Sequence, residues 1–294
     1  MQIPLPPVPL PDHVVEVARE YADGRREAAE PRNAATVILL RDSVDGPEAY
    51  YLRRQLSMDF AAGMAVFPGG GVDPRDFRTD EASELAWAGP PPATWAGRLG
   101  CDEATARALV CAAVRETFEE SGVLLAGPSE DEVVPDTTAA DWEADRVALE
   151  AREVSLSHVL TRRGLVLRSD LLSVWDAWLT PVFEPKRYRT WFFVARLPAG
   201  QVTRDVSRES SSVTWLPASL AADQADSGAL AMMPPTYLTS LEVGTFTDAD
   251  AVLDEAVART PTMFCPTVEP LGDGWTLSMP DRLRALVAAR RATP

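Results

Sequence analysis

The sequence predicts an α/β protein with one large hydrophobic core. Two apolar runs, residues 34–40 and 190–195, have the length and composition of buried strands. Between them, the stretch that starts near Asp102 has the period of an amphipathic helix. The chain has 294 residues, 46% of them hydrophobic, which is enough for one large domain or for a domain with sizeable insertions.

The other elements are predicted from hydrophobic period and from turn residues. Gly89-Pro90-Pro91-Pro92 breaks any regular element within residues 73–100. The predicted strands cover 34–40, 49–54, a short piece within 55–66, 178–181, 190–195 and 212–216. The predicted helices cover 13–30, 102–121, 139–154, 157–163, 165–178, a segment that opens at Met233-Pro234-Pro235, 249–258 and 281–291.

Charge and composition argue against several classes of protein. A net charge of −16 disfavours DNA or RNA as a bulk partner, because nucleic-acid affinity rests on phosphate neutralisation. No apolar run approaches the length of a membrane span, and the first residues lack the layout of a signal peptide. Three cysteines without ligand-like spacing indicate a reduced cytoplasm. Only His13 and His158 are histidines, which disfavours a histidine triad or a histidine-rich zinc site.

The predicted helix at 102–121 carries three carboxylates near its C-terminal end. With Glu116 at zero, a step of about 100° per residue places Glu119 and Glu120 on one arc of about 100°. Gly122 supplies the left-handed residue that ends the helix. The helix is therefore expected to aim its acidic side outward and to bury the opposite face, which carries Val110, Cys111, Val114 and Phe118.

Three converging carboxylates repel one another unless a cation lies among them. Mg²⁺ and similar hard ions take oxygen ligands and share them with water and with substrate phosphates. The helix end therefore has the chemistry of a phosphate-directed metal site. For Glu-x-x-Glu-Glu alone, a solvated acidic helix end is the simpler interpretation, so the context of the motif decides between the two.

That context is Phe67-Pro68-Gly69-Gly70-Gly71, upstream of the helix. With Arg115-Glu116-Thr117-Phe118-Glu119-Glu120-Ser121-Gly122-Val123 it resembles the Nudix box, whose pattern is Gly-x5-Glu-x7-Arg-Glu-U-x-Glu-Glu-x-Gly-U with U apolar. An insertion of about 31 residues lies between the opening Gly70 and Arg115. Arg107 stands where the middle glutamate is expected, and Thr117 replaces an apolar residue.

The resemblance implies a fold and an organisation of the chain. The fold would be a Nudix-type α/β/α sandwich around a mixed β-sheet with helical insertions. The Nudix domain would span 31–245, with an insertion at about 73–100 and a helical insert at about 127–178. An N-terminal arm and helix would occupy 1–30, and a C-terminal helical extension at 246–294 would pack on the same domain.

The resemblance also implies roles for individual residues. Mg²⁺ or Mn²⁺ would be held by the acidic trio together with the Gly69 carbonyl; the trio is Glu116, Glu119 and Glu120. One of the trio, Glu116 or Glu120, would accept the proton of an attacking water. Arg115 would brace the carboxylates by ion pairing, and Glu209 is a further candidate for the base or a metal contact, or else a strand-edge charge.

The likeness extends to the Nudix branch that includes animal coenzyme A diphosphatases. It is carried by Tyr51-Leu52-Arg53-Arg54, Phe67-Pro68-Gly69-Gly70, Trp178-Leu179-Thr180-Pro181 and Arg187-Tyr188-Arg189-Thr190-Trp191-Phe192-Phe193. This implies hydrolysis of a nucleoside diphosphate linked to another moiety, with coenzyme A or acyl-coenzyme A as the leading substrate. Because Gln55 and Asp59 depart from the coenzyme A signature, ADP-ribose, NADH and nucleotide sugars are alternative substrates. A non-catalytic Nudix-like nucleotide-binding regulator is an alternative from another class.

A basic cluster, Lys186-Arg187-Tyr188-Arg189, stands out in this acidic chain. Arginine offers forked donors to phosphate oxygens, so the cluster is a candidate phosphate clamp, with a solvated hairpin tip as the alternative. The expected partner is a small-molecule substrate, with no nucleic acid and no membrane, and the family analogy suggests a homodimer. The candidate substrate contacts are Arg53, Arg54, Phe67, Gly70, Lys186, Arg187 and Arg189.

Overall fold

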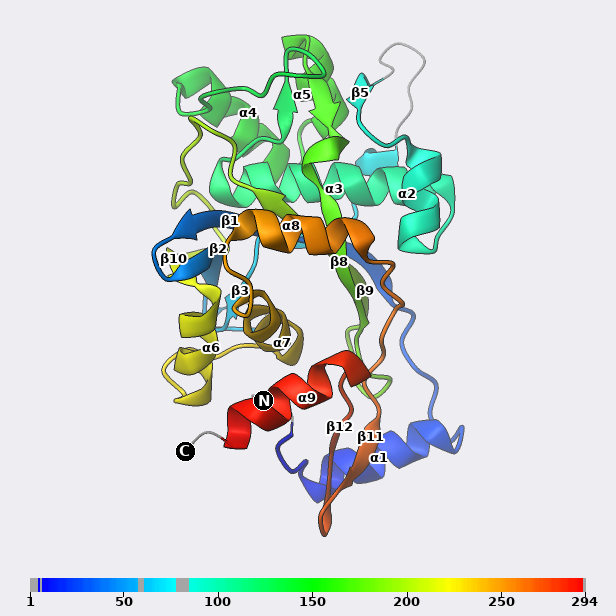
Figure 1. Cartoon of the computed structure of the whole chain (residues 1–294). Helices are drawn as coiled ribbons and strands as arrows, with labels where there is room; N and C mark the ends of the chain where they lie inside the picture. The colour runs from blue at the N-terminus through cyan, green and yellow to red at the C-terminus, as the bar shows by residue number, and fades with distance from the viewer. Residues whose placement is uncertain (1–4, 6, 58–60, 78–84, 293–294) are drawn as a thin grey trace.

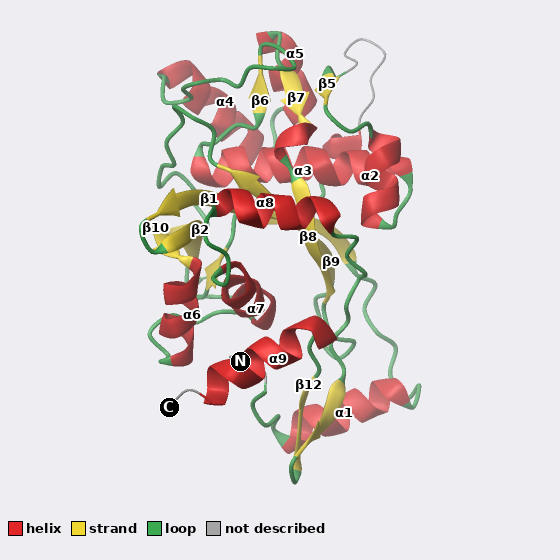
Figure 2. Ribbon diagram, in the orientation of Figure 1, coloured by secondary structure: helices red, strands yellow, loops and turns green. Residues whose placement is uncertain are grey.

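A mixed sheet forms the centre of the protein (Figures 1 and 2). The computed structural model describes residues 5, 7–57, 61–77 and 85–292, so Asp59 and part of the predicted 73–100 insertion lie outside it. The strand order is β10 (Ser210–Pro217), β2 (Gly46–Arg54), β1 (Arg32–Ser43), β9 (Tyr188–Arg196) and β8 (Ser173–Leu179). β1 and β9 are parallel and the other neighbours are antiparallel. Two short strands complete the sheet: β3 (Ala65–Val66) pairs with β2, and β4 (Gly69–Gly71) pairs with β1.

β1 is apolar on both faces because helices cover both sides of the sheet. Ala35, Val37 and Leu39 belong to the core that the sheet forms with α3 (Glu103–Ser121). Ile38 and Leu40 point into a second core, shared with α7 (Pro234–Val243) and α8 (Ala249–Ala258). Successive strand residues point to opposite faces, so one run of apolar residues serves both cores. This is the α/β/α sandwich that was expected.

Inserted segments surround α3 on the first side of the sheet (Figure 2). They comprise η1 (Pro74–Phe77), β5 (Trp87–Ala88), α2 (Pro92–Leu99), β6 (Ala126–Gly127), α4 (Ala140–Glu150), α5 (Leu156–Arg163), β7 (Val166–Arg168) and η2 (Ser169–Leu171). β5, β7 and β6 form a small separate sheet. Arg146 of α4 donates from Nη1 to the Glu119 carbonyl at 2.8 Å, so the insert also holds the last turn of α3.

The second side carries α6 (Ala218–Asp226), α7, α8 and α9 (Asp281–Ala292). Beyond them, the hairpin of β11 (Val268–Leu271) and β12 (Gly274–Leu277) lies beside α1 (Asp12–Ala22), as Figure 1 shows. The Leu10 amide donates to the Trp275 carbonyl at 2.6 Å, and the Arg19 guanidinium lies over the Trp275 ring. Segments from opposite ends of the sequence therefore pack together. No helix within the described ranges is both long enough and apolar enough to span a bilayer.

Most predicted elements are present, and the errors have physical causes. The helix predicted at 165–178 is wrong, because that stretch forms β7, η2 and β8. All but the last residue of β8 are buried, and a strand buried on both faces shows no alternation that would separate it from a buried helix. The N-terminal helix ends at Ala22 rather than at residue 30. α6 and the hairpin β11–β12 were not predicted.

Candidate active site

The C-terminal turn of α3 carries the three carboxylates that the sequence singled out. α3 starts after Asp102, whose side chain accepts from the Thr105 amide at 2.8 Å, and ends at Gly122 with φ 75°. All three carboxylates line one cavity: Glu116, Glu119 and Glu120. They do not form a solvated helix end, the simpler interpretation of the motif alone, because Glu119 and Glu120 are each only 8% exposed. The inserts and β4 enclose this end of the helix.

The glycine strand β4 comes close to these carboxylates because it has no side chains. A Cβ at Gly70 would lie 2.5 Å from Glu116 Oε1, and a Cβ at Gly69 would lie 2.5 Å from the Ala35 carbonyl oxygen. The Gly69 amide donates to Glu120 Oε2 at 2.7 Å. Gly69 therefore contacts the trio through its N–H, while its carbonyl as a metal ligand stays a prediction.

Arg115 is a buried brace for the site, as its predicted ion pairing implies. Its Nη1 donates to Glu116 Oε1 at 2.7 Å and to Glu119 Oε1 at 3.3 Å. Its Nε and Nη2 form a fork on Asp76 at 3.1 and 3.0 Å, and Nη2 also reaches the Gly71 carbonyl at 3.0 Å. Sequence reasoning missed Asp76, which lies in η1. Counted forward from Gly70, Asp76 stands at the glutamate position of Gly-x5-Glu. The count back from Arg115 ended at Arg107 because the insertion lies between the two halves of the motif.

The site carries more negative than positive charge. Arg115 is the shared cation of Asp76, Glu116 and Glu119, while Glu120 accepts a hydrogen bond from the Gly69 backbone amide. Burial raises the pKa of Glu116. Burial and the charge of Glu116 together raise the pKa of Glu119 to about 7, and they raise the pKa of Glu120 well above its usual range. These shifts arise because one guanidinium cannot compensate this many buried carboxylates.

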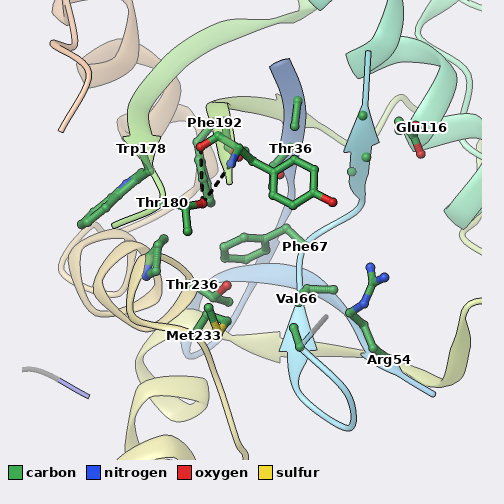
Figure 3. A pocket seen from close by; sticks show the side chains of 18 of the residues that line it. Thr36, Arg54, Val66, Phe67, Glu116, Trp178, Thr180, Phe192, Met233 and Thr236 are labelled. Atoms are coloured by element: carbon green, nitrogen blue, oxygen red, sulfur yellow. Dashed lines mark hydrogen bonds between the residues drawn. The ribbon is translucent and has the colours of Figure 1, made fainter. Parts of the chain in front are cut away.

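The cavity has a volume of about 400 Å³ and two chemically different ends. In Figure 3, Glu116 and Arg54 lie at one end, Trp178 and Thr180 at the other, and Phe67 between them. Arg54 pairs with Glu209 at 3.2 Å, and both line the cavity, so the predicted contact Arg54 and the candidate Glu209 are at the site. Apolar residues of β8, β9, α7 and β12 line the far end: Trp178, Leu179, Phe192, Met233, Pro234 and Leu277.

The structure brings only some of the predicted substrate contacts to this cavity. Phe67, Gly70 and Arg54 line it. Arg53 is exposed and donates to the Gly63 carbonyl at 3.2 Å, away from the lining. Four candidates are absent from the lining within the described chain: Arg53, Lys186, Arg187 and Arg189.

The basic cluster is therefore not a clamp on this cavity. Arg187 is buried and donates to the carbonyls of Thr180 and Ala29, both at 3.1 Å. Arg189 pairs with Glu30 at 2.7 Å, and Lys186 is exposed. Arg187 and Arg189 thus point toward residues 29–31, and Tyr188 is the member of the cluster that lines the cavity.

The donor set fits a hard divalent ion in kind, although the side chains do not already surround one. Carboxylate oxygens beside a cavity are the ligands that Mg²⁺ and Mn²⁺ prefer. Within the described ranges, however, no three His, Cys, Asp or Glu side chains are gathered as they would be around a single ion. Arg115 and the Gly69 amide occupy several of the carboxylate oxygens. An ion bound here would require these side chains to turn from their present partners.

Comparison with known proteins agrees with this geometry. Residues 100–241 match the family model described as the NUDT19 Nudix domain. A NUDIX hydrolase structure from Alicyclobacillus acidocaldarius aligns with a TM-score of 0.65 and 27% identity, covering 77% of this chain and 96% of that one. The fold and the site thus define a mixed α/β Nudix protein. The chain is similar to Nudix hydrolases, and over residues 100–241 to their NUDT19-type branch.

Curated relatives are more distant and longer. A protein named putative nudix hydrolase 7 from Caenorhabditis elegans is 25% identical over 240 residues, which are 80% of this chain and 67% of that protein. Acyl-coenzyme A diphosphatase NUDT19 from Xenopus laevis is 26% identical over 222 residues, which are 65% of this chain and 58% of the relative. The chain thus spans between about half and two thirds of the length of these relatives.

Proposed function

We propose that this protein is a metal-dependent hydrolase that cleaves the diphosphate bond of coenzyme A or acyl-coenzyme A. The observation that carries the proposal is the acidic end of α3, packed against a side-chain-free strand at one end of a cavity whose other end carries the large apolar side chains of Trp178 and Phe192. A diphosphate would lie at the acidic end, and the rest of the substrate would extend toward Trp178 and Leu277. Relatives named acyl-coenzyme A diphosphatases support this choice among Nudix substrates.

The roles of the residues follow from their positions. Glu116, Glu119 and Glu120 would supply oxygen ligands to Mg²⁺ or Mn²⁺, with the Gly69 carbonyl as a further ligand. When bound, the metal would neutralise the diphosphate and lower the pKa of a water molecule. Glu116 or Glu120 would accept the proton of that water.

The supporting residues act around this centre. Arg115 would hold the side chains of Glu116 and Glu119 through the ion pairs described above. Arg54 would exchange its contact with Glu209 for a phosphate oxygen, since a guanidinium binds two phosphate oxygens as readily as a carboxylate.

The test is a substrate and metal screen. The protein is incubated with coenzyme A, acyl-coenzyme A, ADP-ribose, NADH and a nucleotide sugar, each with Mg²⁺, with Mn²⁺ or with a chelator. We expect turnover of coenzyme A or its acyl form, release of 3′,5′-ADP and a phosphopantetheine, and complete loss of turnover with chelator. Cleavage of another conjugate alone would replace the substrate assignment, and binding without turnover across the panel would favour the regulator alternative.

A further inference from the structure

Arg152 is a cavity residue that the family motif does not contain. It follows α4, two residues after Glu150, and both residues line the cavity. Its side chain is 79% exposed, in contrast with the side chain of Arg115, which is 6% exposed at the base of the site. Arg152 therefore stands at the rim of the cavity, outside the buried acidic end.

The guanidinium of Arg152 makes a weak contact in the described structure. Its Nε lies 3.8 Å from Asp73 Oδ2, an ion pair too long for a hydrogen bond. Asp73 already accepts from Arg75 Nε at 2.8 Å and from Arg75 Nη2 at 3.1 Å. Within the described ranges, the other arginines that line the cavity have closer partners: Arg115 on three carboxylates and Arg54 on Glu209.

The backbone holds Arg152 in an uncommon conformation. Its φ is 61°, in the left-handed region that side chains other than glycine seldom adopt, at a cost of roughly 1–2 kcal/mol. The Arg152 amide donates to the Leu149 carbonyl at 2.8 Å, and Arg75 holds the same turn through the Val154 carbonyl at 2.7 Å. A tethered turn thus presents an exposed cation beside an acidic cavity. Strained residues of this kind concentrate at functional sites.

We propose that Arg152 binds a phosphate monoester that the substrate carries in addition to the diphosphate that is cleaved. The proposal rests on the function proposed above and makes it more specific. A forked guanidinium suits the oxygens of a doubly charged phosphate, and a rim position suits a group outside the scissile bond. Coenzyme A carries such a group on its ribose, whereas ADP-ribose and NADH do not. Arg152 would thus be a specificity-determining contact that favours coenzyme A over these alternatives.

Arg208 provides a matched control for Arg152. Its side chain is 74% exposed, and it too forms a long ion pair, with Glu150 at 3.8 Å. It does not line the cavity within the described chain. Replacing either arginine with alanine removes one exposed charge and one weak contact. Alanine at 152 also keeps a Cβ in the left-handed region, so both forms of the chain share the same backbone strain.

The first measurement is equilibrium binding of adenosine 3′,5′-bisphosphate and of AMP by calorimetry. In R152A we expect the affinity for the bisphosphate to fall about tenfold and that for AMP to change less than about twofold. R152K should recover part of the loss, because lysine keeps the charge without the fork. R208A should bind both ligands as the unaltered protein does. An equal loss for both ligands, or no loss for either, would overturn the inference.

The second measurement is turnover of coenzyme A and of dephospho-coenzyme A. In R152A, we expect KM for coenzyme A to rise about tenfold at unchanged kcat, and both constants for dephospho-coenzyme A to stay unchanged. Hydrolysis of coenzyme A with no such selectivity in R152A would overturn the inference and leave the proposed function standing. Binding that depends on Arg152 without any turnover would overturn the proposed function alone. A protein that binds neither nucleotide would overturn the inference directly.

Discussion

Two charge clusters with buried carboxylates lie on opposite sides of the sheet, and they differ in the balance of positive and negative charge. The α9 cluster consists of Asp176, Glu242, Arg259 and Arg282. Glu242 pairs with Arg259 at 3.0 Å and with Arg282 at 3.2 Å, and Arg282 reaches Asp176 at 2.7 Å. This cluster therefore sets two cations against two anions, and it ties together β8, α7, α9 and the end of α8.

The acidic cluster at the active site consists of Asp76, Arg115, Glu116, Glu119 and Glu120. It has one cation for four carboxylates, and it opens on the cavity. A buried charge without a partner is costly, so a fold retains a surplus of this kind only where something compensates it. The α9 cluster is thus balanced by its own arginines, whereas the acidic cluster has surplus negative charge that a cation from outside would balance.

The largest effect should come from removing one charge of the acidic cluster. Glu119→Gln or Glu120→Gln should lower kcat roughly 10³-fold, because a metal ligand contributes several kcal/mol to the transition state. The free energy of unfolding without metal should stay the same or rise, since an uncompensated buried charge is lost. Metal-titrated kinetics and urea unfolding check both points. Near-normal turnover in either variant would refute the assignment of these residues.

The reverse pattern is expected in the α9 cluster. Glu242→Ala should lower the free energy of unfolding by about 3 kcal/mol, because two arginines lose their shared carboxylate. The kcat of the folded variant should stay within about twofold of the original. Glu255→Ala is the control, since this residue is 45% exposed and its pair with Arg259 should contribute less than about 0.5 kcal/mol. Equal costs for the two variants, measured by urea unfolding, would break the comparison.

Arg115→Lys tests whether holding the carboxylates requires the several nitrogens of a guanidinium. Lysine cannot bridge Asp76 and the two glutamates at once, so kcat should fall by about 10- to 100-fold, as is typical when a group that orients metal ligands is changed. The apparent metal affinity should fall with it in a titration of rate against Mg²⁺. A variant with unchanged kcat and unchanged metal affinity would show that charge alone suffices.

The smallest effect is expected at Arg146, which holds the last turn of α3 from outside the site. Arg146→Met keeps the stem but removes the hydrogen bond to the Glu119 carbonyl, so kcat should fall by about threefold to tenfold. Arg146→Lys should recover part of the lost kcat, since a cation near a helix C-terminus is favourable. The metal affinity of each variant distinguishes positioning of the carboxylates from general destabilisation. If both variants bind metal as tightly as the unaltered protein does, Arg146 has only a structural role.

The sequence predicted the parts of the site that are local and missed those that are assembled from afar. Glu116, Glu119 and Glu120 lie within one helical turn, so helical geometry alone placed them together. Asp76 reaches Arg115 across an insertion, and counting back from Arg115 through that insertion led to Arg107 instead of to Asp76, six residues after Gly70. Arg152 comes from the turn after another helix, so no spacing rule linked it to the motif. The basic cluster failed for the same reason, because charge density in the sequence does not show which way a turn faces.

The strands, too, were predicted correctly where the interacting segments are close in the sequence. Strands with a partner nearby in the sequence, such as β1 and β2, were recognised from their apolar runs and the turn between them. β8 was taken for a helix because it is buried on both faces. The hairpin β11–β12 was missed because its residues are mostly part-exposed, with little period to detect.

The wall of the cavity draws on residues from Ala34 in β1 to Leu277 in β12. When the chain has emerged from the ribosome only as far as α3, the three carboxylates are present but much of the cavity wall has not yet been synthesised. The nascent chain cannot complete the cavity until β12 has emerged, because Leu277 lines it together with Trp178 of β8 and Pro234 of α7. Any ligand that assists folding must accordingly act late, after nearly all of the described chain is out of the tunnel.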